Sequence, residues 1–348
     1  MSSGRAEARL AEVFRRQAGQ CADGSPFYAA VLIRAADDLL ARGPCWTVLQ
    51  GHEDDRYGSV IALRFLGAVH RLVLEGRVPD LAARWPPAEL PIDEVWPVYH
   101  STVADQADAL RELVHRPVQT NEVGRCAALL GGFLLVAAET GLPLRILEVG
   151  ASAGLNLRWD RYAYEGGGRW WGDPSSPVRF EGVYEGAVPP LDQAAEVAER
   201  RGCDRSPIDP TTDDGRLTLL SFVWPDQRHR IAQLKAAIAI ARDLPVTVER
   251  ADAVGWLERQ LADRRPGLAT VVYHSIVMQY LPREDRPRVG EVLGETGAAA
   301  DRDAPVAWLR FEPGGDRADV HLTVWPGGKE RHLARSGFHG RPVLWLGS

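Results

Sequence analysis

One stretch, ILEVGASAGLNL at residues 146–157, constrains the fold more than any other part of this sequence. It begins as a short apolar strand, and Gly150 allows the chain to turn sharply where that strand ends. Gly154 lets the backbone approach a ligand closely, and the residues after it are typical of the start of a helix. The unpaired N–H groups of a helix N-terminus favour an anion. The stretch therefore predicts a strand, a turn and a helix that hold a small ligand with an anionic end.

From Asn121 onward, helical and strand patterns alternate. A helix is expected from Glu122, with Asn121 as its N-cap, to about Thr140, and Gly141 ends it. The later strand candidates are Val246–Ala253, Ala269–Val277 and Pro305–Pro313, and the helices between them are expected at Arg230–Arg242 and Val254–Ala262. Strands that are separated by helices form parallel sheets. We therefore expect an α/β fold with a mostly parallel sheet.

Two segments depart from this alternation. Val320–Trp325 alternates apolar and polar residues, turns at Pro326-Gly327-Gly328 and continues through Arg331–Arg335. This pattern predicts an antiparallel hairpin that closes the sheet. The stretch at about 158–190 is rich in Trp, Tyr, Gly and Pro, fits neither pattern, and is expected to be a β insertion.

The first 118 residues are predicted to be helical. Leu10, Val13 and Phe14, for example, share one face of a helix, and the later apolar residues keep the same spacing. A length of 348 residues suggests about two domains. We expect a helical N-terminal subdomain at 1–118, either a plain structural unit or a lid over a ligand site, and an α/β domain at 119–348.

Charge and cysteine content argue against several classes of protein. Lys and Arg number 41 against 47 Asp and Glu, a net charge of −6, so binding to nucleic acid through a broad basic face is not expected. The four cysteines lie far apart, which favours neither a disulfide framework nor a zinc cluster and fits a reducing cytoplasm. No signal peptide is expected, and the longest apolar stretch, at about 127–138, is too short to cross a membrane. The histidines at 321, 332 and 339 show no metal-ligand spacing along the chain, so no metal is expected.

His274 is the best candidate for a catalytic base. It ends an apolar strand, at the edge of the sheet where open α/β folds bind ligands. An imidazole needs little adjustment of its pKa to accept a proton near neutral pH. The alternative is a histidine satisfied by hydrogen bonds within the core. A serine hydrolase built on Ser275 is not expected, because no GxSxG motif is present.

The pattern ExGxxxG, formed by Glu148, Gly150 and Gly154, resembles the nucleotide-binding motif of class I S-adenosylmethionine-dependent methyltransferases. This resemblance implies a Rossmann-like fold closed by an antiparallel hairpin, with S-adenosylmethionine as cofactor. It also implies that an acidic residue at the end of the second strand holds the ribose, and that residues at the end of the third strand hold the adenine. The cofactor-binding residues implied are Glu148, Gly150, Ser152, Gly154, Asp204, Asp252 and Ala253.

Several points stay open at this stage. About 50 residues separate Gly154 from Asp204, more than the methyltransferase pattern usually has, so Asp226 in VWPDQ is a rival for the ribose-binding residue. The alternative for Asp252 is that it caps the following helix. The motifs QTNEVGR, GASAGLNLRWDRY, VWPDQ, HSIVMQYLP and GFHGRP together resemble one bacterial family of unknown function, DUF2332.

The expected function is therefore a cytoplasmic methyltransferase that acts on an unidentified small molecule. One alternative is a methyltransferase-like protein that binds or regulates without turnover. Another is a nicotinamide-dependent oxidoreductase, which the glycine spacing disfavours because it is not GxGxxG. The sequence leaves the acceptor and the oligomeric state open.

Overall fold

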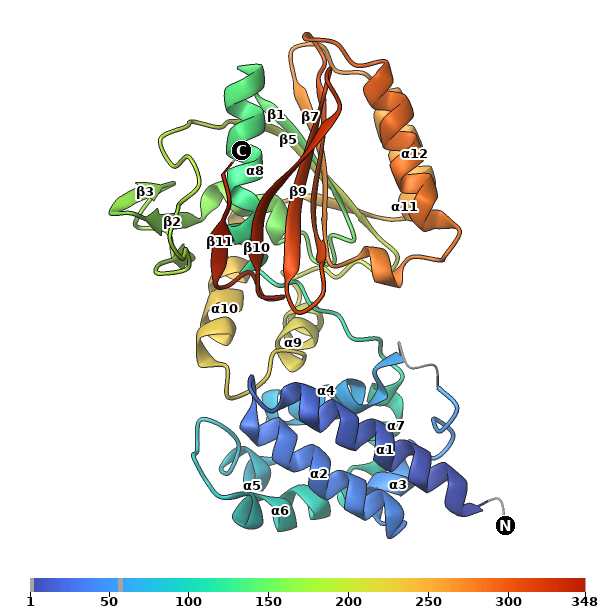
Figure 1. The fold of residues 1–348 in the computed structure, drawn as a ribbon. Helices are drawn as coiled ribbons and strands as arrows, with labels where there is room; N and C mark the ends of the chain where they lie inside the picture. The colour runs from blue at the N-terminus through green and yellow to red at the C-terminus, as the bar shows by residue number, and fades with distance from the viewer. Residues whose placement is uncertain (1–2, 56–58, 348) are drawn as a thin grey trace. The chain divides into compact units, whose positions relative to one another are not determined.

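The structure, a computed structural model, describes residues 3–55 and 59–347. The chain divides into two compact units. The helical unit comprises residues 1–120 and 212–232, and the α/β unit comprises residues 121–211 and 233–348. Each unit has its own core, and the chain crosses between them more than once (Figure 1).

The helical unit is built from amphipathic helices whose apolar faces form one core. Its helices are α1 (Ser3–Cys21), α2 (Pro26–Leu40), α3 (Pro44–Leu49), α4 (Ile61–Leu74), α5 (Pro79–Ala82), α6 (Ile92–Asp105), α7 (Ala107–Val114) and α9 (Asp213–Ser221). Helix α10 (Arg228–Asp243) begins in this unit and continues into the other. The helical prediction for the first part of the chain agrees with these elements.

Residues 212–232 differ from expectation, because the sequence placed them within the α/β domain. Here they pack on the helical unit. The buried Arg71 of α4 donates hydrogen bonds to Asp214 Oδ1 at 2.7 Å and to Thr218 Oγ1 at 2.9 Å. Gly67 has no side chain where the ring of Phe222 packs. These long-range contacts, which leave no pattern along the chain, hold the segment in the helical unit.

The α/β unit contains an eight-stranded sheet in the order β11-β10-β9-β8-β7-β1-β5-β6. Its strands are β1 (Leu144–Val149), β5 (Val197–Asp204), β6 (Thr247–Arg250), β7 (Ala269–Ser275), β8 (Val306–Pro313), β9 (Ala318–Trp325), β10 (Lys329–Ser336) and β11 (Val343–Trp345). The five strands from β6 to β8 pair in parallel, and the pairs from β8 to β11 are antiparallel. The mixed α/β class, the mostly parallel arrangement and the closing hairpin are thus as predicted.

Helices cover both faces of this sheet (Figure 1). Helix α8 (Arg125–Thr140) contacts β7 to β10, and Leu309 of β8 packs on its Gly132. Helices α11 (Ala253–Ala262) and α12 (Asp285–Ala298) pack together on the other face, where Trp308 joins their core. The strand predicted at Val246–Ala253 is shorter than expected, because α11 already begins at Ala253.

The segment at about 158–190 forms a small sheet of its own, in the order β3-β2-β4. Its strands are β2 (Ala163–Gly166), β3 (Arg169–Trp171) and β4 (Arg179–Phe180). Trp159, just before this sheet, is fully buried and stacks on Phe133 of α8 at a ring-centroid distance of 4.4 Å. The aromatic residues of this part of the chain therefore contribute to packing.

Candidate functional site at the carboxyl edge of the sheet

The carboxyl ends of β1, β5, β6 and β7 meet at one edge of the sheet. In the register, Val149 of β1 lies between Cys203 of β5 and His274 of β7. Strand order reverses here, since β5 and β6 lie on one side of β1 and β7 and β8 on the other. Ligands of open α/β sheets bind at such a reversal. This edge is therefore the candidate site.

The glycine turn follows β1 at this edge, as predicted, but side chains pack against it closely. Gly150 has φ +71° and Gly154 has φ +66°, so both occupy the left-handed region that favours glycine. A Cβ at Gly150 would overlap Cγ2 of Val277, and one at Gly154 would come within 2.9 Å of Val246 and Val248. The close approach that the sequence assigned to a ligand is therefore made by valine side chains.

The turn leads into a short 3₁₀ helix, η2 (Asn156–Arg161), instead of the expected α-helix. Backbone N–H groups of the turn before it are also occupied. The N–H groups of Gly150 and Ala151 donate to the carbonyl of Cys203 at 2.9 and 3.0 Å, and that of Gly154 donates to Ala151 at 2.7 Å. These N–H groups of the turn are thus not free to bind an anion.

Side chains from two other elements take the remaining donors of the turn. Asp204, at the end of β5, accepts the N–H of Ser152 at 2.9 Å. Asn121 Oδ1 accepts the N–H groups of Ala153 at 3.2 Å and Leu155 at 2.8 Å. The prediction that Asn121 caps helix α8 was wrong, because the helix begins at Arg125 with Gly124 as N-cap. A long-range contact with the turn takes the place of the local cap.

The structure places Asp204 and Asp252 at neighbouring strand ends. Asp204 is opposite Arg250 in the register, and the N–H of Ala251 donates to the Asp204 carbonyl at 3.1 Å. Asp252 is the N-cap of α11 and accepts the N–H of Gly255 at 2.7 Å through Oδ1. Ala253 is the first residue of that helix. Asp252 is exposed and Asp204 is half-buried, so their carboxylates are the most accessible acidic groups among the predicted site residues.

Glu148 lies beneath the turn and is 1% exposed. Its pKa is raised to about 8, mainly by burial and also by the nearby charge of Asp204, although hydrogen bonds to Tyr273 and Asn156 act in the opposite direction. The Tyr273 hydroxyl donates to Glu148 Oε2 at 3.0 Å. Asn156 in turn accepts from Cys126 Sγ at 3.3 Å. Glu148 is thus a protonated carboxyl at neutral pH, at the centre of a buried polar network.

His274 is fully buried, with a partner at each ring nitrogen. Its Nδ1 lies 2.6 Å from Glu312 Oε1, and its Nε2 accepts from the indole N–H of Trp308 at 3.0 Å. Glu312 Oε1 also accepts the N–H of Val277, the residue packed on Gly150, at 3.0 Å. In this arrangement neither nitrogen is available to a substrate, and the ring links β7 to β8.

Three of the sequence motifs converge beside this network. Arg125, from QTNEVGR, donates to the carbonyl of Ser275 at 2.8 Å and to that of Phe338, in GFHGRP, at 3.1 Å. Its neighbour Glu122 lies 3.1 Å from His339 Nδ1. Arg125 belongs to the polar set at 119–125, for which the sequence left open either the start of a helix or a role in binding, whereas His339 was not predicted to lie at this edge.

A family model described as an uncharacterized protein conserved in bacteria, DUF2332, matches residues 11–345. The chain belongs to the DUF2332 family. No curated protein and no solved structure matched it in the other two comparisons. The family match spans both units of this DUF2332 chain, so the helical unit is as much a part of the family as the sheet.

In this DUF2332 chain Asp226 belongs to the helical unit and not to the sheet. Its Oδ2 accepts the hydroxyl of Ser25, the N-cap of α2, at 2.7 Å. Asp204 is therefore the acidic residue that occupies the end of the second parallel strand. Among the described residues, no helix is both long and apolar enough to cross a membrane.

Proposed function

We propose that the α/β unit binds S-adenosylmethionine at the carboxyl edge of β1, β5 and β6 and transfers its methyl group to a small molecule. One observation carries the proposal. Three adjacent parallel strands end, in chain order, in a glycine turn, an aspartate and a second aspartate. The order β6-β5-β1-β7-β8 agrees with a doubly wound nucleotide-binding sheet, and the antiparallel strands after β8 agree with the methyltransferase resemblance.

The residues present suit the nucleoside half of this cofactor. A carboxylate has about four acceptor sites, so Asp204 can accept ribose hydroxyls while it still holds the N–H groups of Ser152 and Ser206. Asp252 would accept from the adenine amino group. The N–H of Ala253, in the first turn of α11, has no carbonyl partner within its helix and would meet a ring nitrogen.

The glycine turn would act as a rigid platform instead of a donor to the methionine carboxylate, because its own N–H groups are occupied. Asn121 and Asp204 hold it in place by accepting its N–H groups. The sulfonium of the cofactor supplies an activated methyl group, so the protein needs mainly to position the acceptor and to exclude water. Since both His274 nitrogens are bonded, the proposal does not use His274 as a base.

Calorimetric titration with S-adenosylhomocysteine tests the proposal on the full chain. Asp252→Asn keeps a good N-cap but removes the charge, and Asp252→Ala removes both, so affinity should fall modestly and then strongly. Thr212→Ala is the matched control, because Thr212 caps α9 through Gly215 in the same way but lies in the helical unit. Absence of binding at millimolar ligand would overturn the proposal. Binding of NADH instead would favour the oxidoreductase alternative.

A second candidate, a binding protein without turnover, is favoured by the occupied His274. The two differ in one outcome. In the test, the protein is incubated with a metabolite extract and labelled S-adenosylmethionine. If adenosyl ligands bind but no labelled product forms, the hypothesis of a binding protein without turnover is supported.

A further inference from the structure

Two histidines and an aspartate meet on the antiparallel part of the sheet, where Asp319 of β9 is opposite Glu312 of β8 in the register. His321 of β9 and His332 of β10 are direct cross-strand partners. Asp319 precedes His321 by two residues, so both side chains lie on the same face of β9. Directly opposed side chains on an antiparallel pair have Cβ atoms about 4.5–5.5 Å apart. The pairing therefore brings together residues that show no ligand spacing along the chain.

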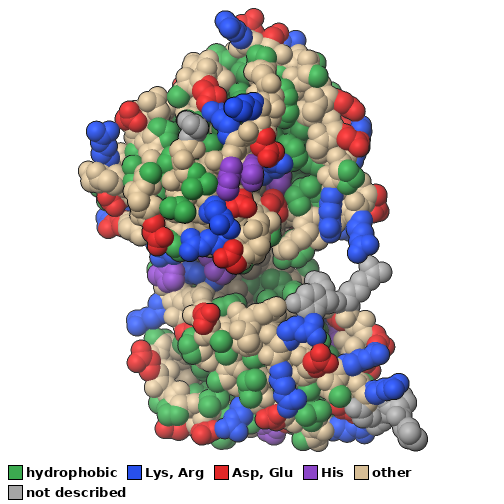
Figure 2. Space-filling view, viewed as in Figure 1, with side chains coloured by type: hydrophobic (Ala, Val, Ile, Leu, Met, Phe, Trp, Pro, Cys, Tyr) green, Lys and Arg blue, Asp and Glu red, His purple; other side chains and the backbone are tan. Residues whose placement is uncertain are grey.

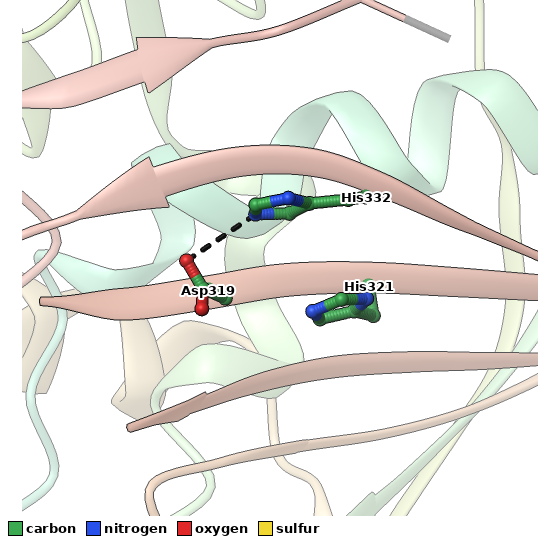
Figure 3. A group of neighbouring side chains, drawn as sticks. All are labelled: Asp319, His321 and His332. Atoms are coloured by element: carbon green, nitrogen blue, oxygen red, sulfur yellow. Dashed lines mark ion pairs between the residues drawn. The ribbon is translucent and has the colours of Figure 1, made fainter. Parts of the chain in front are cut away.

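The donor atoms of the three side chains lie within 4.8 Å of one another. Figure 3 shows the two imidazole rings side by side across the strands, with Asp319 reaching towards His332. His332 Nε2 is 3.2 Å from Asp319 Oδ1, and the two rings are nearly parallel, at 9°, with centroids 4.7 Å apart. A zinc ion holds nitrogen and oxygen ligands at about 2.0–2.2 Å, so donors on one ion lie within about 4.4 Å of each other. Small side-chain rotations would bring the three donors to that spacing.

The cluster is reachable from solvent. Helix α12 covers only one end of this face of β9, where Trp325 packs on Gly297. The cluster itself remains partly exposed. The side chains of His321 and His332 are 31% and 38% exposed. Figure 2 shows histidine side chains on the surface of this unit, with acidic and basic side chains around them.

The neighbouring charges leave the cluster able to take a cation. Arg335 Nε donates to Asp319 at 3.1 Å, but Asp316 lies 3.4 Å from the same guanidinium and can keep it when Asp319 turns to an ion. Arg310 is paired with Glu330. Burial lowers the pKa of His321, and the charges of His332 and Arg310 lower it further, although Glu330, 3.2 Å from its Nδ1, opposes this. A neutral imidazole keeps the lone pair that a metal requires.

We propose that Asp319, His321 and His332 form a binding site for a divalent transition metal, with zinc as the ion that the test uses. Two imidazoles and one carboxylate are ligands typical of zinc, iron, cobalt and nickel. Three protein ligands leave at least one coordination position for water or a small ligand. Glu330, beside His321, lies where it would accept a hydrogen bond from the ring nitrogen that does not bind the metal. This proposal is independent of the adenosyl site.

The test is a titration of the metal-stripped full chain with ZnCl2 by calorimetry, and with Co²⁺ by visible absorption, which reports coordination geometry. We expect one ion per chain, and a loss of affinity of about tenfold or more in His321→Ala, His332→Ala and Asp319→Asn. Zinc should also raise the melting temperature of the wild type but not that of His332→Ala.

His52→Ala is the matched control. His52 also lies beside a carboxylate, 3.1 Å from Asp55, and faces a second histidine ring, His115, at 5.1 Å, but it is in the helical unit. This variant should bind as the wild type does. The melting curves of the metal-free variants show whether each one is folded. No binding below millimolar metal, or equal affinity in His332→Ala and the wild type, would overturn the proposal.

Discussion

The carboxylate of Asp204 accepts the backbone N–H of Ser152 at 2.9 Å, across 52 residues of sequence. Its other oxygen accepts the N–H of Ser206 at 2.8 Å. The end of β5 thus fixes the turn after β1 before any ligand is present. A preorganised turn of this kind limits the conformational entropy that a ligand must remove on binding.

Replacing Asp204 should therefore destabilise the protein as well as weaken binding. Asp204→Ala leaves two half-buried N–H groups without their acceptor, and we expect the free energy of unfolding in urea to fall by about 1–3 kcal/mol. Asp209→Ala is the control, because Asp209 accepts from Thr211 in an exposed loop, where water can replace it. Equal losses in the two variants would contradict a special role for Asp204.

Gly150 should tolerate a methyl group less well than a glycine of the same backbone conformation elsewhere. Gly141 ends α8 at φ +66° with open space around it, so Gly141→Ala should cost only the left-handed strain, about 1–2 kcal/mol. Gly150→Ala also overlaps Val277 and should cost about 1–3 kcal/mol more. Val277→Ala should rescue part of that extra loss but none of the Gly141→Ala loss, as measured by chemical denaturation of the double variants.

We expect Glu148 to make the protein less stable as pH rises from about 4.5 to about 8. Its pKa is raised to about 8 in the folded protein, against an ordinary value of 4.5 for glutamate. Between these values the folded state holds a proton that the unfolded state has released, so the free energy of unfolding falls as pH rises through about 8. Glu148→Gln has no proton to lose. Urea unfolding between pH 5 and 9 should show a decline in the wild type that is absent in this variant, and parallel curves would contradict the prediction.

His70 should make the stability depend on pH in the opposite direction, with a loss in acid. It is buried in α4, which lowers its pKa to about 4 from the ordinary value of 6.5 for histidine, and its Nδ1 contacts the Ser221 carbonyl at 3.3 Å. Below pH 6.5 the unfolded chain binds a proton at this histidine that the folded chain does not bind. The free energy of unfolding is therefore highest above pH 6.5 and falls as pH drops towards 4. His70→Gln should be less stable at pH 7 but should lose less between pH 7 and 4.5.

The elements of the fold were largely predictable, because their apolar periods are local. The helix ending at Gly141, the hairpin around Pro326 and the strand at 269–275 agree closely with the sequence patterns. The role of Asn121 was not predictable in the same way. An asparagine before a helix is usually a cap, and only the fold shows that its oxygen accepts from Ala153 and Leu155 instead.

The histidine cluster was likewise not predictable from local sequence patterns. His321 and His332 are eleven positions apart, and the register of β9 with β10 makes them direct partners. Spacing rules along a chain recognise ligands on one helix or one loop. They cannot recognise ligands that come together through strand pairing.

The discontinuous helical unit has a consequence for synthesis on the ribosome. Residues 1–120 emerge first, but Phe222, Trp224 and Asp214, which complete the packing of that unit, follow only after β1 and β5 have been made. The nascent N-terminal helices therefore keep apolar surface exposed to solvent until the later segment has been synthesised. For the same reason, no single cleavage of the chain can release either unit intact.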